Sequence, residues 1–185
     1  MLIRIIDVAV SLLGLFILSP VLMIIFFIGI FDTGAPFFLQ VRVGLKQKPF
    51  ILFKFRTMKM DTASMGSHLV DPAMITYFGK FLRRAKLDEL PQLWNVLKGD
   101  MSLVGPRPCL LNQTDVIKER SILGVFDFKP GITGLAQINK IDMSQPKRLA
   151  EADAEMLKDL TIRYILRIII NTLIGKGFGD AVKRK

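Results

Sequence analysis

Two adjacent carboxylates, Asp88 and Glu89, have the residue types and spacing that best suit chemistry in this chain of 185 residues. The pair comes just before Pro91, and an aspartate cap followed by a proline in the first turn favours the start of a helix. Carboxylates at a helix start could simply cap the helix and complement its dipole. A carboxylate can also bind Mg²⁺ or act as a covalent nucleophile. The residues around the pair decide between these roles.

Cationic residues gather around this pair along the sequence. They are Arg83 and Lys86 just before it, Lys54 and Arg56 in an earlier segment, and Arg107 in a turn between two prolines. Fixed cations beside a carboxylate pair suit a diphosphate and its Mg²⁺, because negative charge shields the phosphorus of a diphosphate from an anionic nucleophile. These neighbours favour a catalytic site over a helix cap.

Other chemistries lack their motifs in this sequence. No glycine-rich phosphate loop of the G-x-x-x-x-G-K-[ST] or G-x-G-x-x-G type occurs, and there is no G-x-S-x-G nucleophile motif. One Cys and one His cannot form a disulfide scaffold or a Cys/His zinc site. We interpret Cys109 as a buried small hydrophobe and His68 as a surface residue.

Charge and hydropathy point in different directions. There are 26 basic and 16 acidic residues, a net charge of +10, which suits a polyanion-binding protein. The 51% of hydrophobic residues suits a membrane protein and excludes disorder. No nucleic-acid-binding motif accompanies the charge, so we expect no nucleic acid partner. The two signals come from different parts of the chain, because only Arg4, Asp7 and Asp32 are charged before Arg42.

An uncharged, apolar run extends from Val8 to Phe31. A helix of about 20 such residues can cross a hydrocarbon core about 30 Å thick. Ser19 and Pro20 interrupt the run, and a proline removes one helix hydrogen bond and kinks the helix. The Ser19 hydroxyl could bond to the carbonyl that the proline leaves without a donor. We therefore expect a membrane helix that is kinked at Ser19-Pro20.

Three topologies compete for this run. A cleaved signal peptide is disfavoured, because no small-residue cleavage pattern follows Phe31. Positive residues lie on both sides, Arg4 before the run and Arg42 and Lys46 after it, so both ends resemble cytoplasmic ends. A helix that enters one leaflet and returns explains this symmetry and the kink, while a spanning helix with a proline stays an alternative.

The rest of the chain has the pattern of a small globular domain. Alternation predicts a β-hairpin over 37–44 and 50–58, and a polar loop follows over 59–76. Helical spacing predicts an apolar helix face that ends at Gly99 and consists of Leu90, Leu93, Trp94 and Leu97. Further expected elements are helices over 76–84, 109–124 and 146–173, a strand over 101–104, a turn over 129–134 and a basic tail over 176–185.

The predicted fold class is therefore α/β, mostly α, with a β-hairpin and several short helices. We expect a re-entrant membrane segment over 1–36 and a cytoplasmic catalytic domain over 37–185. The last helix is expected to be amphipathic and to lie at the membrane interface, because the two arginines Arg163 and Arg167 would be costly in mid-membrane.

Five motifs occur in order along the body. They are Lys54-Phe55-Arg56-Thr57-Met58, Leu87-Asp88-Glu89-Leu90-Pro91-Gln92, the stretch from Asn95 to Ser102, Gly105-Pro106-Arg107-Pro108, and the stretch from Pro130 to Gln137. Together with the Ser19-Pro20 segment, they resemble the bacterial sugar transferase family, the monotopic phosphoglycosyl transferases. The resemblance extends over most of the chain and fades after about residue 140.

The resemblance implies an enzyme that moves a phospho-sugar from a UDP-sugar to polyprenol (undecaprenyl) phosphate, releases UMP and uses Mg²⁺. In the family, the aspartate matching Asp88 is the nucleophile that forms a covalent phosphosugar intermediate, and the glutamate matching Glu89 assists it. Asp88 is also the expected metal ligand. The substrate- or phosphate-binding residues that we expect are Lys54, Arg56, Arg83, Arg107, Gln137 and Asp153.

The resemblance also implies a location. The family's Ser-Pro pair, here Ser19 and Pro20, breaks the membrane helix so that both ends stay on one side. The expected enzyme is therefore monotopic, lies at the cytoplasmic face of the bacterial inner membrane and catalyses the first membrane step of glycoconjugate or polysaccharide synthesis. Anionic phospholipid and a second copy of the chain, in a homodimer, are further expected partners.

The chain departs from the family pattern after residue 140. The family commonly has other residues at the positions of Lys140-Ile141, Glu155-Met156 and Ile165. These differences affect the predicted sugar pocket and the alignment of Asp153 with the aspartate of the family. Two alternatives from other classes stay open at this point. One is a membrane-anchored polyanion-binding protein, and the other is a scaffold with a degenerate site.

Overall fold

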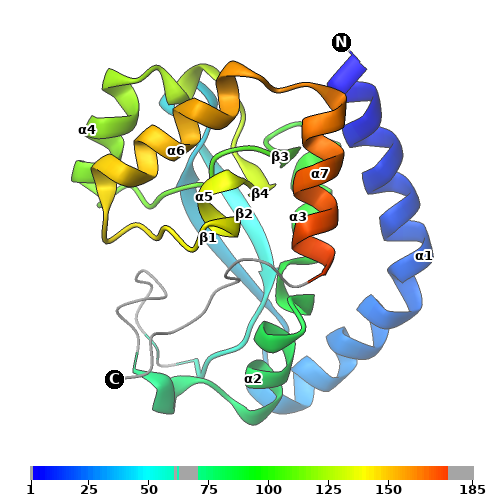
Figure 1. The fold of residues 1–185 in the computed structure, drawn as a ribbon. Coiled ribbons are helices and arrows are strands. Elements are labelled where there is room, and N and C mark those ends of the chain that lie inside the picture. The colour runs from blue at the N-terminus through cyan, green and yellow to red at the C-terminus, as the bar shows by residue number, and fades with distance from the viewer. Residues whose placement is uncertain (1, 61, 63–70, 175–185) are drawn as a thin grey trace.

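The computed structural model describes residues 2–60, 62 and 71–174 of the chain. Helices predominate, and two small two-stranded sheets lie among them (Figure 1), so the predicted mostly α fold of the α/β class is confirmed. Residues 61 and 63–70 of the predicted loop, including His68, and the basic tail lie outside the described residues. The elements are α1 (Leu2–Thr33), β1 (Phe37–Val43), β2 (Pro49–Phe55), α2 (Tyr77–Arg84), α3 (Gln92–Lys98), β3 (Ser102–Val104), α4 (Thr114–Ile122), β4 (Gly131–Thr133), α5 (Leu135–Ile138), α6 (Pro146–Lys158) and α7 (Ile162–Leu173).

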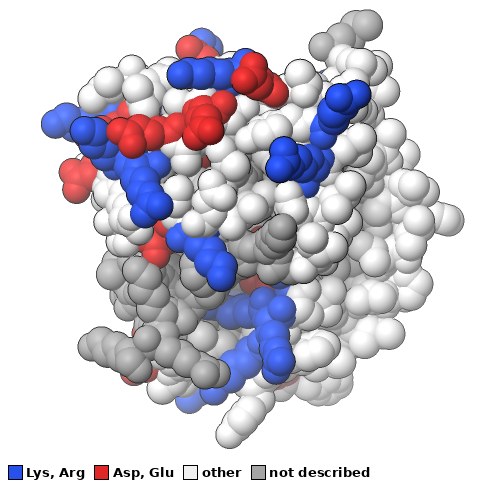
Figure 2. All heavy atoms as spheres, viewed as in Figure 1, with Lys and Arg blue, Asp and Glu red and all other residues white. Residues whose placement is uncertain are grey.

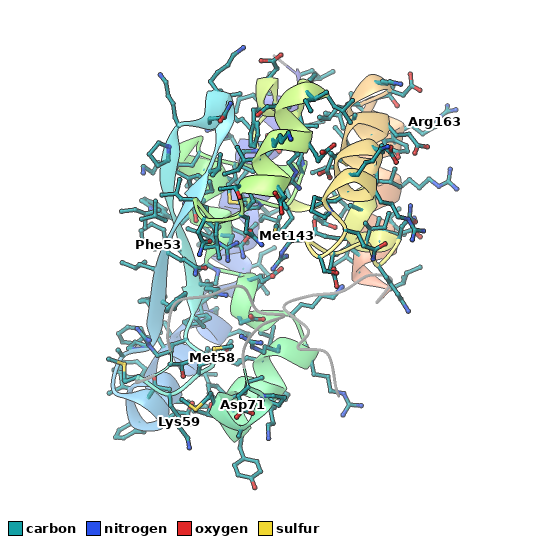
Figure 3. All side chains as sticks on the ribbon, turned by 90° about the vertical axis from the view of Figure 1, so that its left-hand side faces the viewer. Phe53, Met58, Lys59, Asp71, Met143 and Arg163 are labelled. Atoms are coloured by element: carbon teal, nitrogen blue, oxygen red, sulfur yellow. The ribbon has the colours of Figure 1, made fainter. Side chains whose placement is uncertain are left out.

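The predicted β-hairpin is confirmed as the antiparallel pair β1 and β2. Leu39 lies opposite Phe53, and Phe38 lies opposite Lys54, so these two pairs occupy opposite faces of the hairpin. Figure 3 shows Phe53 on the outer face, pointing away from the other elements. Lys54 therefore faces the body, where its side chain is buried. The hairpin positions this lysine for the site.

The second sheet corrects the prediction of a turn over 129–134. β4 pairs in parallel with β3, and Ser102 lies opposite Gly131. The pairing continues past the strand end, where Gly105 and Gly131 pack so closely that a Cβ on Gly131 would lie 2.0 Å from the Gly105 nitrogen. The glycines that suggested a turn instead let two backbones touch.

The predicted helix over 146–173 is two helices. α6 ends at Lys158, and α7 begins after Thr161, whose hydroxyl accepts a hydrogen bond from the Tyr164 N–H at 3.3 Å. Ile165 and Ile168 of α7 pack into the main core with residues of α3, β3 and α6. The amphipathic character is confirmed, because Arg163 and other residues of the opposite face are exposed and Arg163 extends away from the body (Figure 3).

α1 is a single helix with Pro20 inside it, and it curves around the body (Figure 1). Pro20 has no N–H for the carbonyl of Phe16, four residues earlier. The Ser19 hydroxyl donates to that carbonyl at 2.7 Å, as the sequence predicted. By length and composition alone, α1 could cross a membrane, and little of its most apolar stretch is buried in the protein.

The N-terminal end of α1 is fixed to the body by two charged residues. The Arg4 guanidinium donates to two carbonyls at the C-terminal end of α3, at 2.5 and 2.8 Å. The Asp7 carboxylate accepts hydrogen bonds from the Ser102 hydroxyl and the Leu103 N–H, both at 3.0 Å. Asp7 is 4% exposed, so these bonds replace the water that an isolated carboxylate would need.

The C-terminal end of α1 is fixed to the same body. The Thr76 hydroxyl, at the start of α2, donates to the Asp32 carboxylate at 2.7 Å. Between the two ends, the outer face of α1 is exposed and apolar, with Phe16 78% and Phe31 88% exposed. Figure 2 shows the same contrast, because charged side chains gather on the left and centre while the edge formed by α1 has none.

α3 buries a different face from the predicted one. Leu93 and Leu97 are only partly buried and Trp94 is 51% exposed, whereas Asn95 is fully buried. The Asn95 side chain accepts from the Phe53 N–H at 2.9 Å and donates to a second backbone group of β2 at 2.7 Å. A polar side chain therefore fixes the rotation of α3 against β2, which the apolar spacing could not indicate.

Candidate active site

Asp88 and Glu89 lie in a 3-10 turn, Leu87–Glu89, which we call the Asp88 turn. The residue before it, Lys86, has a left-handed φ of 57°. The helix start expected at Asp88 is wrong, because α3 begins only after Pro91, and this also excludes the alternative that the pair caps the helix. Asp88 is 1% and Glu89 7% exposed. Two adjacent buried carboxylates are costly unless cations compensate them, so this turn is a functional candidate.

Arg107 compensates one of the two carboxylates. Its Nη2 atom donates to Glu89 Oε1 at 2.7 Å, a charge-assisted hydrogen bond. The Glu89 side chain is 8% exposed and that of Arg107 22%, so the guanidinium still reaches solvent. The pair places a fixed positive charge beside the Asp88 turn.

The backbone of Arg107 is fixed by Arg120, a residue that the sequence motifs did not indicate. Arg120 of α4 donates through Nη1 to the backbone carbonyl of Arg107 at 2.8 Å. Its Nε atom donates to Asp153 Oδ2 at 2.9 Å, and Nη2 lies 2.6 Å from the same oxygen. Both side chains of this ion pair are at most 2% exposed. Asp153, predicted to bind substrate, thus acts through Arg120 on the turn that carries Arg107.

Burial raises the pKa of two groups beside Arg120. It raises the pKa of the Asp153 carboxyl above its ordinary value, and the Arg120 guanidinium opposes that rise. Burial also raises the pKa of the Cys109 thiol, again against the effect of Arg120. A thiol that resists ionisation is a poor nucleophile, which agrees with the interpretation of Cys109 as a small hydrophobe.

Lys54 lies between two small cationic cavities on the inner side of the hairpin. One of them is also lined by Arg42, Gln92 and Arg107. The other is also lined by Phe38, Arg56, Lys59 and Arg83. The structure therefore brings together four of the predicted phosphate-binding residues, Lys54, Arg56, Arg83 and Arg107, although they come from three separate segments of the chain.

Two of these cations are also bound to the protein itself. The Arg56 guanidinium donates to the carbonyls of Ala35 and Phe37 at 3.0 and 3.2 Å, where α1 leads into β1. Arg83 donates through Nε to the Thr57 hydroxyl at 2.8 Å. These bonds orient both guanidinium groups, and fixed cations stabilise developing charge better than mobile ones do.

Arg42 is a second residue that the sequence analysis missed. It is 6% exposed, and its Nη1 atom donates to the Pro108 carbonyl at 3.0 Å. Its Nε atom donates to the Gln40 side chain at 3.0 Å. Arg42 thus supports the turn of Arg107 from the hairpin side and adds a positive charge to the cavity beside Lys54.

Gln137 lies apart from the cationic cavities and lines a larger one together with Glu89. It is 9% exposed, and its Nε2 atom donates to the Ile132 carbonyl at 3.1 Å. Within the described part of the chain, its Oε1 atom has no hydrogen-bond partner. A hydroxyl or N–H group of a bound substrate would satisfy this oxygen.

The carboxylate pair fits a magnesium ion that substrate phosphates help to hold. Among residues 2–60, 62 and 71–174, no group of three or more His, Cys, Asp or Glu side chains is placed to bind a metal. Mg²⁺ commonly takes only one or two protein carboxylates and completes its shell with water and phosphate oxygens. Asp88 and Glu89 can supply that share.

The fold and the site combine a long apolar helix with a buried carboxylate pair among fixed cations, an arrangement that suits an enzyme of phosphate esters at a membrane. The family model described as bacterial sugar transferase matches residues 1–177. The chain therefore belongs to the bacterial sugar transferase family, as the five motifs predicted.

Several curated proteins are similar to this chain. The uncharacterized sugar transferase EpsL of Bacillus subtilis is 43% identical over 141 residues, which cover 76% of this chain and 69% of EpsL. The UDP-glucose:undecaprenyl-phosphate glucose-1-phosphate transferase of Escherichia coli is 36% identical over 183 residues, 93% of this chain and 39% of that protein. A Caulobacter vibrioides protein of the same name is 32% identical over 180 residues, 92% of this chain and 67% of its length. The chain thus spans less than half of some relatives.

Proposed function

We propose that this chain transfers a sugar phosphate from a UDP-sugar to polyprenol phosphate and releases UMP. The observation that carries the proposal is the buried Asp88-Glu89 pair, with Arg107 bonded to Glu89 at 2.7 Å and Lys54 beside Arg107. The relatives' names support it, because the Escherichia coli and Caulobacter vibrioides proteins are named for undecaprenyl phosphate and a UDP-sugar.

The first step uses Asp88 as the nucleophile. Its carboxylate oxygen attacks the phosphorus that bears the sugar, the bond from that phosphorus to the UMP oxygen breaks, and UMP leaves with the bonding electrons. Lys54 and Arg107 neutralise charge on the diphosphate, and Glu89 holds the Arg107 guanidinium in place. Asp88 would also hold Mg²⁺, which would supply further neutralisation of charge.

The second step restores the enzyme. An oxygen of polyprenol phosphate attacks the same phosphorus, the bond to Asp88 breaks, and the carboxylate is regenerated beside a polyprenyl diphosphate sugar. No proton is transferred in either step, so the reaction needs no histidine as general base. This agrees with the described charged residues around Asp88 and Glu89, which are lysines and arginines. Splitting the reaction lets a soluble donor and a lipid acceptor use one site in turn.

We propose further that α1 enters one leaflet of the inner membrane from the cytoplasmic face and returns to that face. A straight helix of 32 residues would be about 48 Å long and would separate its ends across a bilayer. Arg4 at one end and Asp32 at the other are instead hydrogen-bonded to the same body. The exposed Trp94 and the arginines of α7 suit the interface, where they can contact lipid headgroups.

Release of UMP tests the reaction. We expect the purified chain, with Mg²⁺ and polyprenol phosphate in detergent or liposomes, to release UMP from at least one member of a panel of UDP-sugars. Omitting polyprenol phosphate should limit release to about one UMP per enzyme molecule, because the intermediate then accumulates. If no UDP-sugar supports release while the protein retains nucleic acid at physiological salt, the polyanion-binding alternative is correct.

Labelling of single cysteines tests the topology. In a Cys109→Ala background, we expect Leu2→Cys and Tyr77→Cys to resist a membrane-impermeant maleimide in intact cells and to react after permeabilisation. Leu2 is 56% and Tyr77 92% exposed, so accessibility within the protein is not limiting. Reaction of Leu2→Cys in intact cells, with Tyr77→Cys still protected, would establish a spanning helix instead.

A further inference from the structure

A cavity of about 340 Å³ lies against Glu89, and none of its described lining residues also lines one of the two cationic cavities. Its volume lies in the range of about 300–1,000 Å³ that small-molecule sites occupy. The Asp88 turn and the start of α3 form one side of it, and β4, α5 and the end of α7 form the other. Gln137 is an expected substrate-binding residue that lines this cavity, whereas Lys54, Arg56, Arg83 and Arg107 line the two cationic cavities.

The walls of this cavity are largely apolar. Leu87, Leu90, Leu93, Ile132 and Leu173 line it. The hydroxyls of the two threonines in the lining are hydrogen-bonded to each other at 2.7 Å, so they are already satisfied. The polar groups that remain for a ligand, mainly Gln137 Oε1 and the charged Lys86 and Glu89, are too few to replace the hydration of a nucleotide or diphosphate, whereas an apolar chain matches the leucine and isoleucine walls.

The cavity is also next to the membrane helix. Leu93 packs on α1 so closely that a Cβ on Gly14 would lie 3.2 Å from its Cδ1 atom. Leu87 packs against a buried cluster that contains Ile25 of the same helix. One layer of side chains therefore separates the cavity from α1, whose outer face we place in the lipid.

Two charged residues line the end of the cavity that the Asp88 turn and the residue before it form. Lys86 is a cation that can pair with a lipid phosphate, and the Glu89 carboxylate is already paired with Arg107. A lipid phosphate at this end would lie beside the Asp88 turn, with its chain directed toward the apolar walls. The donor diphosphate would lie on the side of Lys54 and Arg107, where the cations gather.

We propose that this cavity binds the isoprenoid segment next to the phosphate of polyprenol phosphate, so that donor and acceptor approach Asp88 from different cavities. The proposal rests on the proposed function and adds to it the place of the acceptor. It also explains why Leu87, Leu90 and Leu93 stand directly around the catalytic turn, where polar residues would be expected in a site for two hydrophilic substrates.

The test fills the cavity from its rim and separates the two half-reactions. Leu173 is 80% exposed and Ala85 is exposed, so Leu173→Trp and Ala85→Trp are compatible with folding. Leu166→Trp is the matched control, because Leu166 is an exposed leucine of the same helix that does not line the cavity. For each variant, UMP release is measured without acceptor, with polyprenol phosphate, and with a phosphate ester of a single isoprene unit.

We expect both cavity variants to raise the KM for polyprenol phosphate about tenfold, the loss that corresponds to about two buried methylene groups. Release of UMP without acceptor and the KM for the UDP-sugar should stay at the control's values, and the effect should shrink with the one-isoprene acceptor. Slower UMP release without acceptor would indicate that the cavity binds the sugar of the donor. A KM for polyprenol phosphate equal to that of Leu166→Trp would indicate that the cavity binds neither substrate. Both outcomes overturn the proposal, whereas absence of UMP release from the unmodified chain would refute the proposed function instead.

Discussion

Replacement of Asp88 by asparagine is expected to lower sugar-phosphate transfer by at least about a thousandfold. The amide has nearly the shape of the carboxylate but is neutral and a poor nucleophile, so the first step loses its attacking oxygen. A donor labelled in its sugar and β-phosphate, quenched with denaturant, should leave label on the unmodified chain and none on Asp88→Asn. UMP release measured in parallel gives the size of the loss.

Glu89→Gln is the matched comparison for this experiment. It changes the neighbouring carboxylate in the same way but keeps the Asp88 nucleophile, so we expect a labelled adduct that forms more slowly. The thermal midpoint of Asp88→Asn should equal or exceed that of the unmodified chain, because a carboxylate that is 1% exposed is replaced by a neutral group. A labelled adduct on Asp88→Asn at the normal rate would exclude Asp88 as the nucleophile.

Local patterns predicted the parts of this protein that local forces determine. The alternating sequence that predicts the hairpin matches the alternation of its two faces, because Phe53 lies on the outer face and Lys54 is buried on the inner face. The role predicted for the Ser19 hydroxyl is confirmed, because a proline always frees the carbonyl four residues earlier. The motifs around Lys54, Asp88 and Arg107 indicated residues that the fold indeed places in neighbouring cavities and turns, although their roles stay proposals.

Contacts between distant segments explain what the patterns missed. Arg120 is 33 residues from Asp153 and 13 from Arg107, and no periodicity links an arginine of one helix to a carboxylate of another. The strand β4 was predicted as a turn, because its glycines serve a close backbone approach that only the paired strand reveals. The rotation of α3 depends on Asn95, whose partners belong to β2.

The ion pair of Arg120 and Asp153 gives the second large expected effect, this time on stability. Asp153→Ala leaves a buried guanidinium without its counter-charge, which we expect to destabilise the fold by about 3–5 kcal/mol. The thermal midpoint in detergent measures this loss. Because burial raises the pKa of the Asp153 carboxyl, the carboxylate itself is already costly in this site, and the pair is a weak source of net stability.

A double variant separates stability from positioning. Arg120→Met with Asp153→Leu removes both charges, and apolar side chains of similar volume should restore most of the thermal midpoint. The bond from Arg120 Nη1 to the Arg107 carbonyl is still lost in this variant. If Arg120 positions Arg107, the refolded double variant stays impaired in kcat, with a KM for polyprenol phosphate near normal, because Arg107 acts on the diphosphate rather than on the lipid chain. Full recovery of kcat together with the thermal midpoint would show that the pair serves folding alone, and Arg107 would then be held by Glu89 and Arg42 without help from α4.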